Sequence, residues 1–490
     1  MPSVTQAVLR SWSVPPAVTF AIALSAIVYL RGWWLLRRAG SPSIPRGRAA
    51  TFLLGLFSLW IALASPMDVF NGFVLTAHML QHMMLMMVAP PLLLLGSPLV
   101  PMVRGLPIFA AREFAGPFLN WPVAKRIGMA LTNPVFALVL MGVAMFTWHT
   151  PALYELALRS PAWHQTEHAC FLLASLIFWW PVVQPWPSRA QWPRWAMVPY
   201  LLVADLQNTA LSAILAFSDR VLYPSYSSVP RLFGFSALED QAAAGAIMWV
   251  VGSIAFVIPA VVIAVQCLST RSSHETITGV RRCDSTAFEP QFSRPAGMLS
   301  RTRWGGYRAE AASFLILFTA AALCFAGLVA TGTNDDDDQV LRFKGSSGPF
   351  AVALYAPPGD LAPDETAFSV LVQERSTQAV LLDATVDVTA LSSADAQETA
   401  STVRANNANA PNRLLQTAEL KLARGDWNLN IAVSYNSKHG HVSVPLRVVP
   451  RETGGEYPLS YVVIAAFSMV LLGVYFGRHR SRRAESPAQA

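Results

Sequence analysis

Long apolar runs dominate the chain and have the length of membrane-spanning helices. A helix needs about 20 mostly apolar residues to cross a hydrocarbon core, and it can do so because its backbone hydrogen bonds are satisfied internally. Nine runs meet or approach this length, at residues 16–36, 50–66, 70–100, 131–150, 163–183, 196–217, 240–267, 311–331 and 457–477. We therefore predict an α-helical polytopic membrane protein of about nine spans, with a seven-helix core over residues 1–270.

Residues 335–455 follow a different pattern, in which short runs alternate between apolar and polar positions. Runs such as 367–372 and 441–449 are separated by turns rich in Pro, Gly and Asp, for example at 357–360. Strands spaced in this way are typical of an antiparallel β-sandwich. The four aspartates at 335–338 predict a solvated linker rather than a calcium site, since no loop geometry accompanies them.

Composition and charge refine this picture. Hydrophobic residues make up 53% of the chain and charged residues 13%, whereas an average soluble domain is roughly 25% charged. A soluble enzyme and a disordered protein are therefore excluded. Most basic residues lie in alternate loops, which the positive-inside rule assigns to the cytoplasm. The loop 271–310 and the tail 478–490 are predicted inside, the N-terminus and residues 335–455 outside, and no nucleic-acid partner is expected.

Histidines gather at the predicted outer ends of three spans. His78 and His82 lie in the third span, His149 ends the fourth, and His164 and His168 begin the fifth. Residues four apart share a helix face, so the two imidazoles of each HxxxH pair can chelate one metal ion. A lone intramembrane histidine more often hydrogen-bonds a neighbouring helix, but two pairs and a fifth histidine on one side predict a metal or redox-cofactor site.

Methionines extend this surface along the third span. Met79, Met83 and Met86 lie on the helix that carries His78 and His82. Imidazole and thioether together suit copper, and thioether favours Cu(I), so these methionines are predicted auxiliary ligands; gap-filling packing is the alternative. At the start of the seventh span Asp240 is predicted to orient a histidine, with a supporting role for nearby residues. Those residues are Gln241 and Met248.

Two further polar features allow two interpretations each. Asp205 lies inside the sixth span, where a buried acid fits either a proton or ion step or pairing with a polar group of a neighbouring helix. His439 and His441 fall on one face of a strand, which could bind copper. A solvated hairpin turn at Gly440 is the favoured reading of this segment.

The motifs around these residues resemble the polytopic CtaG family of cytochrome c oxidase assembly factors. Its hallmark is similar to residues 77–96 (AHMLQHMMLMMVAPPLLLLG), and a second motif to Trp148, His149 and Pro151. Glu167-His168 matches the histidine of the next helix. Residues 239–249 (EDQAAAGAIMW) resemble the last motif. The likeness covers residues 50–268, and the chain departs from the family by about 220 further residues, which resemble YtkA-like or FixH-like extracytoplasmic sandwiches.

The resemblance implies a non-enzymatic factor that helps to supply copper to the oxidase, in the plasma (inner) membrane of a bacterium. The resulting hypothesis is a protein without catalytic residues that holds copper, as Cu(I), at the outer face and passes it on. Cytochrome c oxidase subunits, a copper donor protein and the lipid membrane are the expected partners. A membrane oxidoreductase or haem/quinone protein, and a copper transporter, are the alternative hypotheses.

Overall fold

The computed structural model describes most of the membrane core and of the β-domain. The described residues are 4–40, 45–115, 121–188, 190–280, 339–357, 361, 365–392, 401–408, 410 and 412–449. The predicted spans 311–331 and 457–477, the acidic run 335–338 and the tail 478–490 lie outside them, as does most of the predicted loop 271–310.

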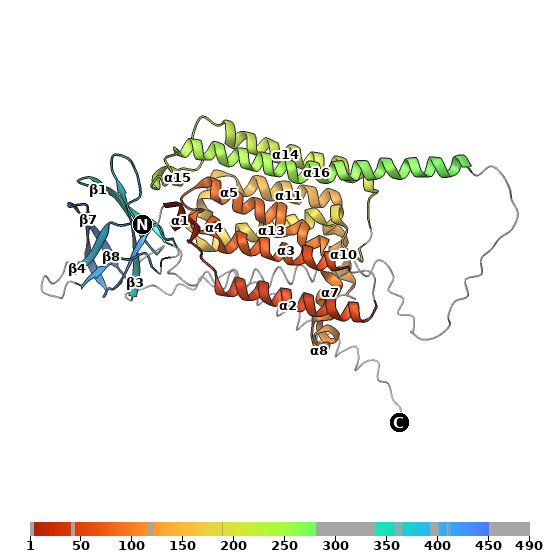
Figure 1. Ribbon diagram of the computed structural model, residues 1–490, viewed down its shortest axis with the longest axis horizontal. Helices are drawn as coiled ribbons and strands as arrows, with labels where there is room; N and C mark the ends of the chain where they lie inside the picture. Colours follow the sequence, from red (N-terminus) through yellow and green to blue (C-terminus); the bar gives the residue numbers. More distant parts are fainter. Residues whose placement is uncertain are drawn as a thin grey trace, which may run out of the picture.

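A bundle of apolar helices forms the membrane part (Figure 1). Its elements are α1 (Val4–Leu9), α2 (Pro16–Arg38), α3 (Arg46–Ala64), α4 (Pro66–Phe70), α5 (Leu75–Met83), the π-helix η1 (Met84–Val88), α6 (Ala89–Leu95), α7 (Leu99–Gly105), α8 (Ile108–Ala110), the π-helix η2 (Ala111–Ala115), α10 (Pro122–Leu131), α11 (Pro134–Trp148), α12 (Pro151–Arg159), α13 (Pro161–Val183), the 3-10 helix η3 (Arg194–Ala196), α14 (Met197–Phe217), α15 (Ser225–Ser228) and α16 (Ala237–Val280). Among the described residues six helical segments are long and apolar enough to span a membrane. A seventh results if α11 and α12, bent by 71° at their junction, form one span.

These segments confirm the predicted fold class of a polytopic α-helical membrane protein. Two details differ from the prediction. The fourth span is broken, because Pro151 restarts the chain as α12 at a sharp angle after His149. The last helix of the core, α16, continues to Val280 and so enters the segment that was predicted as a loop from residue 271.

The third span contains two prolines and still continues as a helix. Pro90 and Pro91 have no backbone N–H, so the carbonyl of Met86 loses its helical partner whether the turn is α or π. The span widens into the π-helix η1 just before the prolines. The indole Nε1 of Trp179 on α13 donates to the Met86 carbonyl over 3.0 Å. The span therefore continues past the prolines, with the exposed carbonyl satisfied by a neighbouring helix.

Two antiparallel sheets form the second part of the molecule. The strands are β1 (Val340–Ser347), β2 (Phe350–Ala356), β3 (Glu365–Glu374), β4 (Thr385–Ser392), β5 (Ser401–Arg404), β6 (Gln416–Lys421), β7 (Gly425–Tyr435) and β8 (Lys438–Val448). The sheet orders are β1-β2-β3-β6 and β5-β4-β7-β8. Buried residues of both sheets, among them Phe368 and Ile431, share one apolar core. This confirms the predicted antiparallel β-sandwich.

One turn of the sandwich differs from the prediction. The β7–β8 hairpin turns at Asn436 and Ser437, which both have positive φ as a tight two-residue turn requires. Gly440 therefore lies inside β8 rather than in a turn. His439 and His441 flank it as exposed residues of that strand, and His439 Nδ1 is 3.2 Å from the Ser434 hydroxyl.

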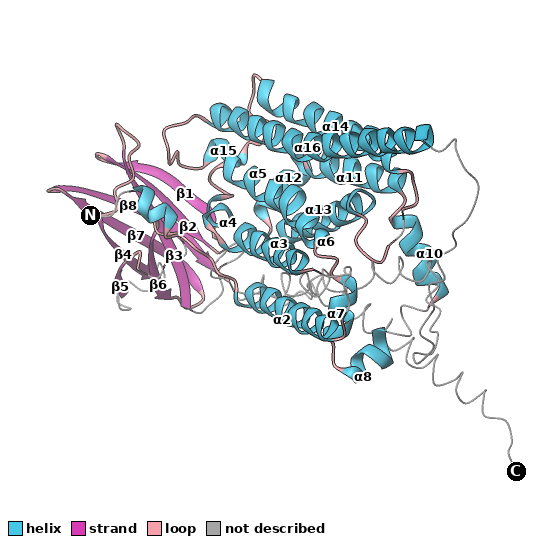
Figure 2. Ribbon diagram, turned by 45° about the vertical axis from the view of Figure 1, so that its right-hand side comes forward, coloured by secondary structure: helices cyan, strands magenta, loops and turns pink. Residues whose placement is uncertain are grey.

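The β-sandwich packs against one end of the helix bundle, as both views show (Figures 1 and 2). Its Tyr355 ring contacts Phe73 with 5.3 Å between centroids. Lys344 donates to the Ser228 carbonyl at 3.0 Å and Gln373 to the Arg231 carbonyl at 2.7 Å. Arg37 and Arg38 end α2 at the far end of the bundle. The sandwich and these basic residues thus lie at opposite ends of the membrane helices.

Candidate metal centre

Four histidines form two levels inside the bundle, one helical turn apart. His78 and His164 each occupy the fourth position of their helices, α5 and α13. Their ring centroids are 5.1 Å apart, and those of His82 and His168, one turn further on, are 5.4 Å apart. The two HxxxH pairs therefore face each other on helices that run in the same direction. The sequence predicted each pair, and the fold brings the pairs together.

The spacing of the donor atoms suits a single metal ion. The Nε2 atoms of His78 and His82 are 2.9 Å apart. Two nitrogen ligands at a tetrahedral site, with bonds of about 2.0 Å, would be about 3.3 Å apart. Ligand atoms of His78, His82 and His168 all lie within 4.8 Å of one another. These three imidazoles could therefore close around one ion with small movements of their rings.

A tyrosine determines which nitrogen of His78 is free. The Tyr226 hydroxyl lies 2.6 Å from the Asn71 carbonyl, which can only accept, so the hydroxyl donates there. Its oxygen then accepts from His78 Nδ1 at 3.2 Å. Burial raises the pKa of Tyr226 well above its usual value, so the phenol keeps its proton. His78 consequently carries its proton on Nδ1 and directs the Nε2 lone pair towards His82.

A hydrogen bond on Nδ1 also orients the ring of His149. Its Nδ1 is 2.8 Å from the Met145 carbonyl, and since a carbonyl only accepts, Nδ1 carries the proton. The other nitrogen, Nε2, is buried and has no hydrogen-bond partner among the described residues. The ring centroid lies 6.3 Å from that of His82, so this lone pair is available next to the inner level of the cluster. Orientation of a ring by a hydrogen bond on its second nitrogen is usual for metal-binding histidines.

Glu167 is a further potential metal ligand, for which the sequence had suggested no role. Its side chain is fully buried, and its two oxygens lie 3.8 Å from Nε2 of His78 and of His82. Neither oxygen has a hydrogen-bond donor among the described residues. Ligand atoms of His78, His164 and Glu167 form a second group within 4.8 Å of one another. Two features of the sequence could have indicated this role: Glu167 is an acid inside a membrane span, and it follows His164 by three residues, which places both on one helix face.

The methionines predicted as auxiliary ligands lie in the apolar core. Met79, Met83 and Met86 are at most 1% exposed and belong to the large hydrophobic cluster of the bundle. The groups of histidines and acids described above contain imidazoles and one carboxylate. Packing, the alternative considered for these side chains, fits these surroundings, and their role as auxiliary copper ligands stays a prediction.

Asp240 acts on the helix that carries His78 and His82, not on an imidazole as predicted. Its carboxylate accepts from the backbone N–H groups of Leu75 at 2.7 Å and Thr76 at 3.1 Å. The Thr76 hydroxyl donates to it at 2.6 Å. Val74, which precedes α5, provides no side-chain cap. A carboxylate from α16 thus satisfies the free N–H groups at the start of α5, where the helix dipole also favours negative charge.

Gln241 and Met248, predicted as supporting residues, contact backbone groups. Gln241 accepts from Leu222 N–H at 2.7 Å and donates to the Arg220 carbonyl at 3.2 Å. It therefore holds the loop that leads to Tyr226. Met248 is fully buried, and its carbonyl accepts from Asn208.

Two polar features away from the cluster have their partners nearby. Asp205 on α14 accepts from the Ser253 hydroxyl of α16 at 2.8 Å, which is the helix-pairing alternative proposed for it.

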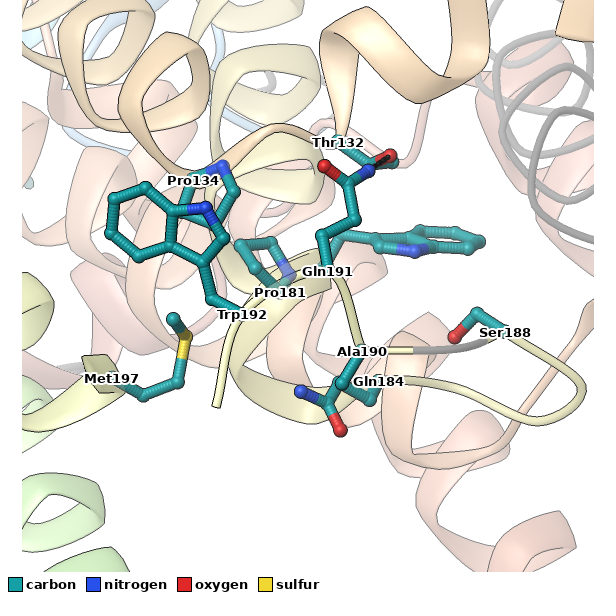
Figure 3. A pocket seen from close by; sticks show the side chains of 10 residues that line it. Thr132, Pro134, Pro181, Gln184, Ser188, Ala190, Gln191, Trp192 and Met197 are labelled. Carbon is teal, nitrogen blue, oxygen red and sulfur yellow. Dashed lines mark hydrogen bonds between the residues drawn. The ribbon is translucent and has the colours of Figure 1, made fainter. Parts of the chain in front are cut away.

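At the end of the bundle far from the sandwich, a small pocket is lined by residues around Gln191 and Thr132 (Figure 3). Gln191 donates to the Thr132 hydroxyl at 2.8 Å. Neither feature presents a group of metal ligands like that of the histidine cluster.

The fold and the cluster define a polytopic membrane protein with a buried imidazole–carboxylate site. Residues 27–270 match the model of the cytochrome c oxidase caa3 assembly factor family, Caa3_CtaG. The membrane core of the chain belongs to this family, as its motifs suggested.

Mycobacterial proteins are similar to the same region. Uncharacterised proteins of Mycobacterium bovis and Mycobacterium tuberculosis are each 28% identical over 255 residues, which is 49% of this chain and 37% of theirs. One from Mycobacterium leprae is 26% identical over 293 residues, 59% of this chain and 44% of its own length. The chain thus spans less than half of the relatives it matches. No solved structure matches it.

Proposed function

We propose that this protein binds copper in the histidine cluster and supports its insertion into cytochrome c oxidase during assembly. The observation that carries the proposal is the alignment of two HxxxH pairs, with His149 beside them, on three helices. Imidazole is a good ligand for copper. Family membership connects such a site to an enzyme whose assembly requires copper.

The position of the cluster fits a delivery role. It lies within the first turns of α5 and α13, at the end of the bundle against which the β-sandwich packs. An ion held there would be close to one membrane surface. On the predicted topology this is the outer surface, where an oxidase subunit and a copper donor protein would meet the protein.

The proposal is tested in a bacterial host that lacks the protein and expresses the oxidase. Wild-type protein is expected to restore the ratio of copper to haem in the purified oxidase, and His78→Ala to fail, because His78 belongs to both groups of ligands. Immunoblots establish equal amounts of the two proteins in the membrane. Arg159→Ala, which removes an exposed ion pair with Glu155, is the control expected to restore the ratio. Restoration by His78→Ala would refute the proposal.

Tyr226→Phe is expected to lower copper affinity without unfolding the protein. The change removes the oxygen that accepts from His78 Nδ1, and loss of such an orienting hydrogen bond typically costs about 10–100-fold in metal affinity. Competition with a chromophoric chelator measures the affinity of the purified protein. Tyr200→Phe removes a buried hydroxyl that donates to Phe178, remote from the cluster, and should keep wild-type affinity. Equal affinities for both variants would contradict the assigned role of Tyr226.

A further inference from the structure

We propose that the cluster holds one copper ion in either of two positions and that the ion moves between them while bound to His78. The outer position consists of His78, His164 and Glu167, and the inner position of His78, His82 and His168. The inference rests on the proposed copper binding. It adds a stoichiometry and a route for the ion within the site.

The two positions exclude each other because both need the same lone pair. His78 Nδ1 donates a hydrogen bond to the Tyr226 hydroxyl oxygen, so His78 can offer only Nε2 to a metal ion. One neutral imidazole nitrogen binds one metal ion at a time. The ligand sets therefore overlap at His78 and cannot both be complete. This makes a pair of simultaneously occupied sites incompatible with the geometry.

The positions differ in depth and in access. His164 is half-buried and lies in the first turn of α13, whereas His82 and His168 are 0% and 4% exposed. A rise of about 1.5 Å per residue puts the backbone of His82 and His168 roughly 6 Å further along their helices than that of His78 and His164, while the Nε2 atoms of His78 and His82 are 2.9 Å apart. An ion coming from the sandwich end of the bundle therefore meets the outer position first.

The donor types also differ between the positions. Glu167 supplies the outer position with a carboxylate whose oxygens have no hydrogen-bond donor among the described residues. Such a carboxyl group can coordinate a cation directly, with release of any bound proton. The three ligands of the inner position are imidazoles, with the free Nε2 of His149 next to them, and Glu167 Oε1 lies 3.8 Å from His82 Nε2. The outer position is thus suited to capture, and the inner one to retention.

The distances allow the ion to move by exchanging ligands stepwise. The ring centroids of His164 and His168 are 4.2 Å apart and those of His78 and His82 are 4.3 Å apart. Since His78 belongs to both positions, the ion keeps one imidazole while it leaves His164 and Glu167 for His82 and His168. Release towards a partner follows the same exchange in reverse.

The experiment uses full-length protein in detergent with Cu(I) supplied anaerobically. Wild-type protein should retain a single copper ion per chain after dialysis. Stopped-flow absorbance of a competing chelator gives the loading rate, and titration gives the affinity. His164→Ala should slow loading about tenfold or more and change affinity by less than about threefold, whereas His168→Ala should show the opposite pattern, with the affinity loss typical of a disturbed metal site.

Gln165→Ala is the matched control for His164→Ala, because Gln165 is the adjacent half-buried residue. It should load and bind as wild type does, and thermal unfolding of all variants verifies that they are folded. Two copper ions per wild-type chain, or parallel losses of rate and affinity in both histidine variants, would overturn the two-position site while leaving copper binding intact. Absence of copper from the wild type would overturn the proposed function as well.

Discussion

His78→Ala is expected to lower the copper affinity of the purified protein by more than about 100-fold, the largest loss for a single substitution in the cluster. His78 contributes to both groups of ligand atoms, and Tyr226 orients its ring. Removal of a ligand should exceed the roughly 10–100-fold loss caused by removing a residue that only orients one. Titration of Cu(I) against a chelator of known affinity measures the effect.

His149→Ala provides the matched comparison for this prediction. His149 is buried and oriented by Met145 but belongs to neither group of ligand atoms. Its removal should cost about 10–100-fold, in the range of a residue next to the ligands. A loss for His149→Ala that equals or exceeds the loss for His78→Ala would show that the ion lies elsewhere among the histidines.

Asp240→Ala is expected to lower the free energy of unfolding by about 3 kcal/mol, because hydrogen bonds to a charged group contribute about 1.5–3 kcal/mol each and are not additive. The change removes the acceptor for two backbone N–H groups and a hydroxyl at the start of α5. The same helix carries His78 and His82, so copper affinity should fall together with stability. Chemical unfolding in mild detergent and the chelator titration measure the two effects.

Asp240→Asn distinguishes the contribution of the hydrogen bonds at the start of α5 from the contribution of the negative charge. Asparagine keeps the size of the side chain and one acceptor oxygen, and it is itself a good helix cap. We expect it to retain about half of the stability lost in Asp240→Ala, and more of the copper affinity. If Asp240→Ala unfolds at the wild-type denaturant concentration, the carboxylate does not anchor α5.

The membrane fold could be predicted because the lipid environment imposes a simple rule on the sequence. Only a long apolar helix can cross the hydrocarbon core, so Pro16–Arg38 or Pro161–Val183 is visible as a span without a structure. The prolines at 90 and 91 could not be interpreted in this way. Whether they break the helix depends on Trp179, which lies 93 residues after Met86 in the sequence.

The candidate site could be predicted within each helix but not between helices. The four-residue spacing determines that His78 and His82 share a face. That this face meets His164 and His168 depends on helix packing. Tyr226 of α15 and Asp240 of α16 make contacts that join residues 148 and 165 positions apart. Local periodicity contains no information about such contacts.

Residue type alone does not determine which side chains form the site. The methionine stripe suggested soft ligands, and Met79, Met83 and Met86 pack in the apolar core, so their role as ligands stays a prediction. Glu167 received no role although it is the only carboxylate in the described ligand groups. Residue type defines what a side chain can bind, and its neighbours in the fold decide whether it is positioned to bind.

Copper content is the most direct test of the central claim that the paired histidines hold a metal ion. The protein is purified from copper-supplemented cells, and copper per chain is measured for wild type and for the double variant His78→Ala/His82→Ala. We predict a single ion per wild-type chain and none in the double variant, with both proteins folded. Copper absent from the wild type, or retained equally by the double variant, would contradict the account.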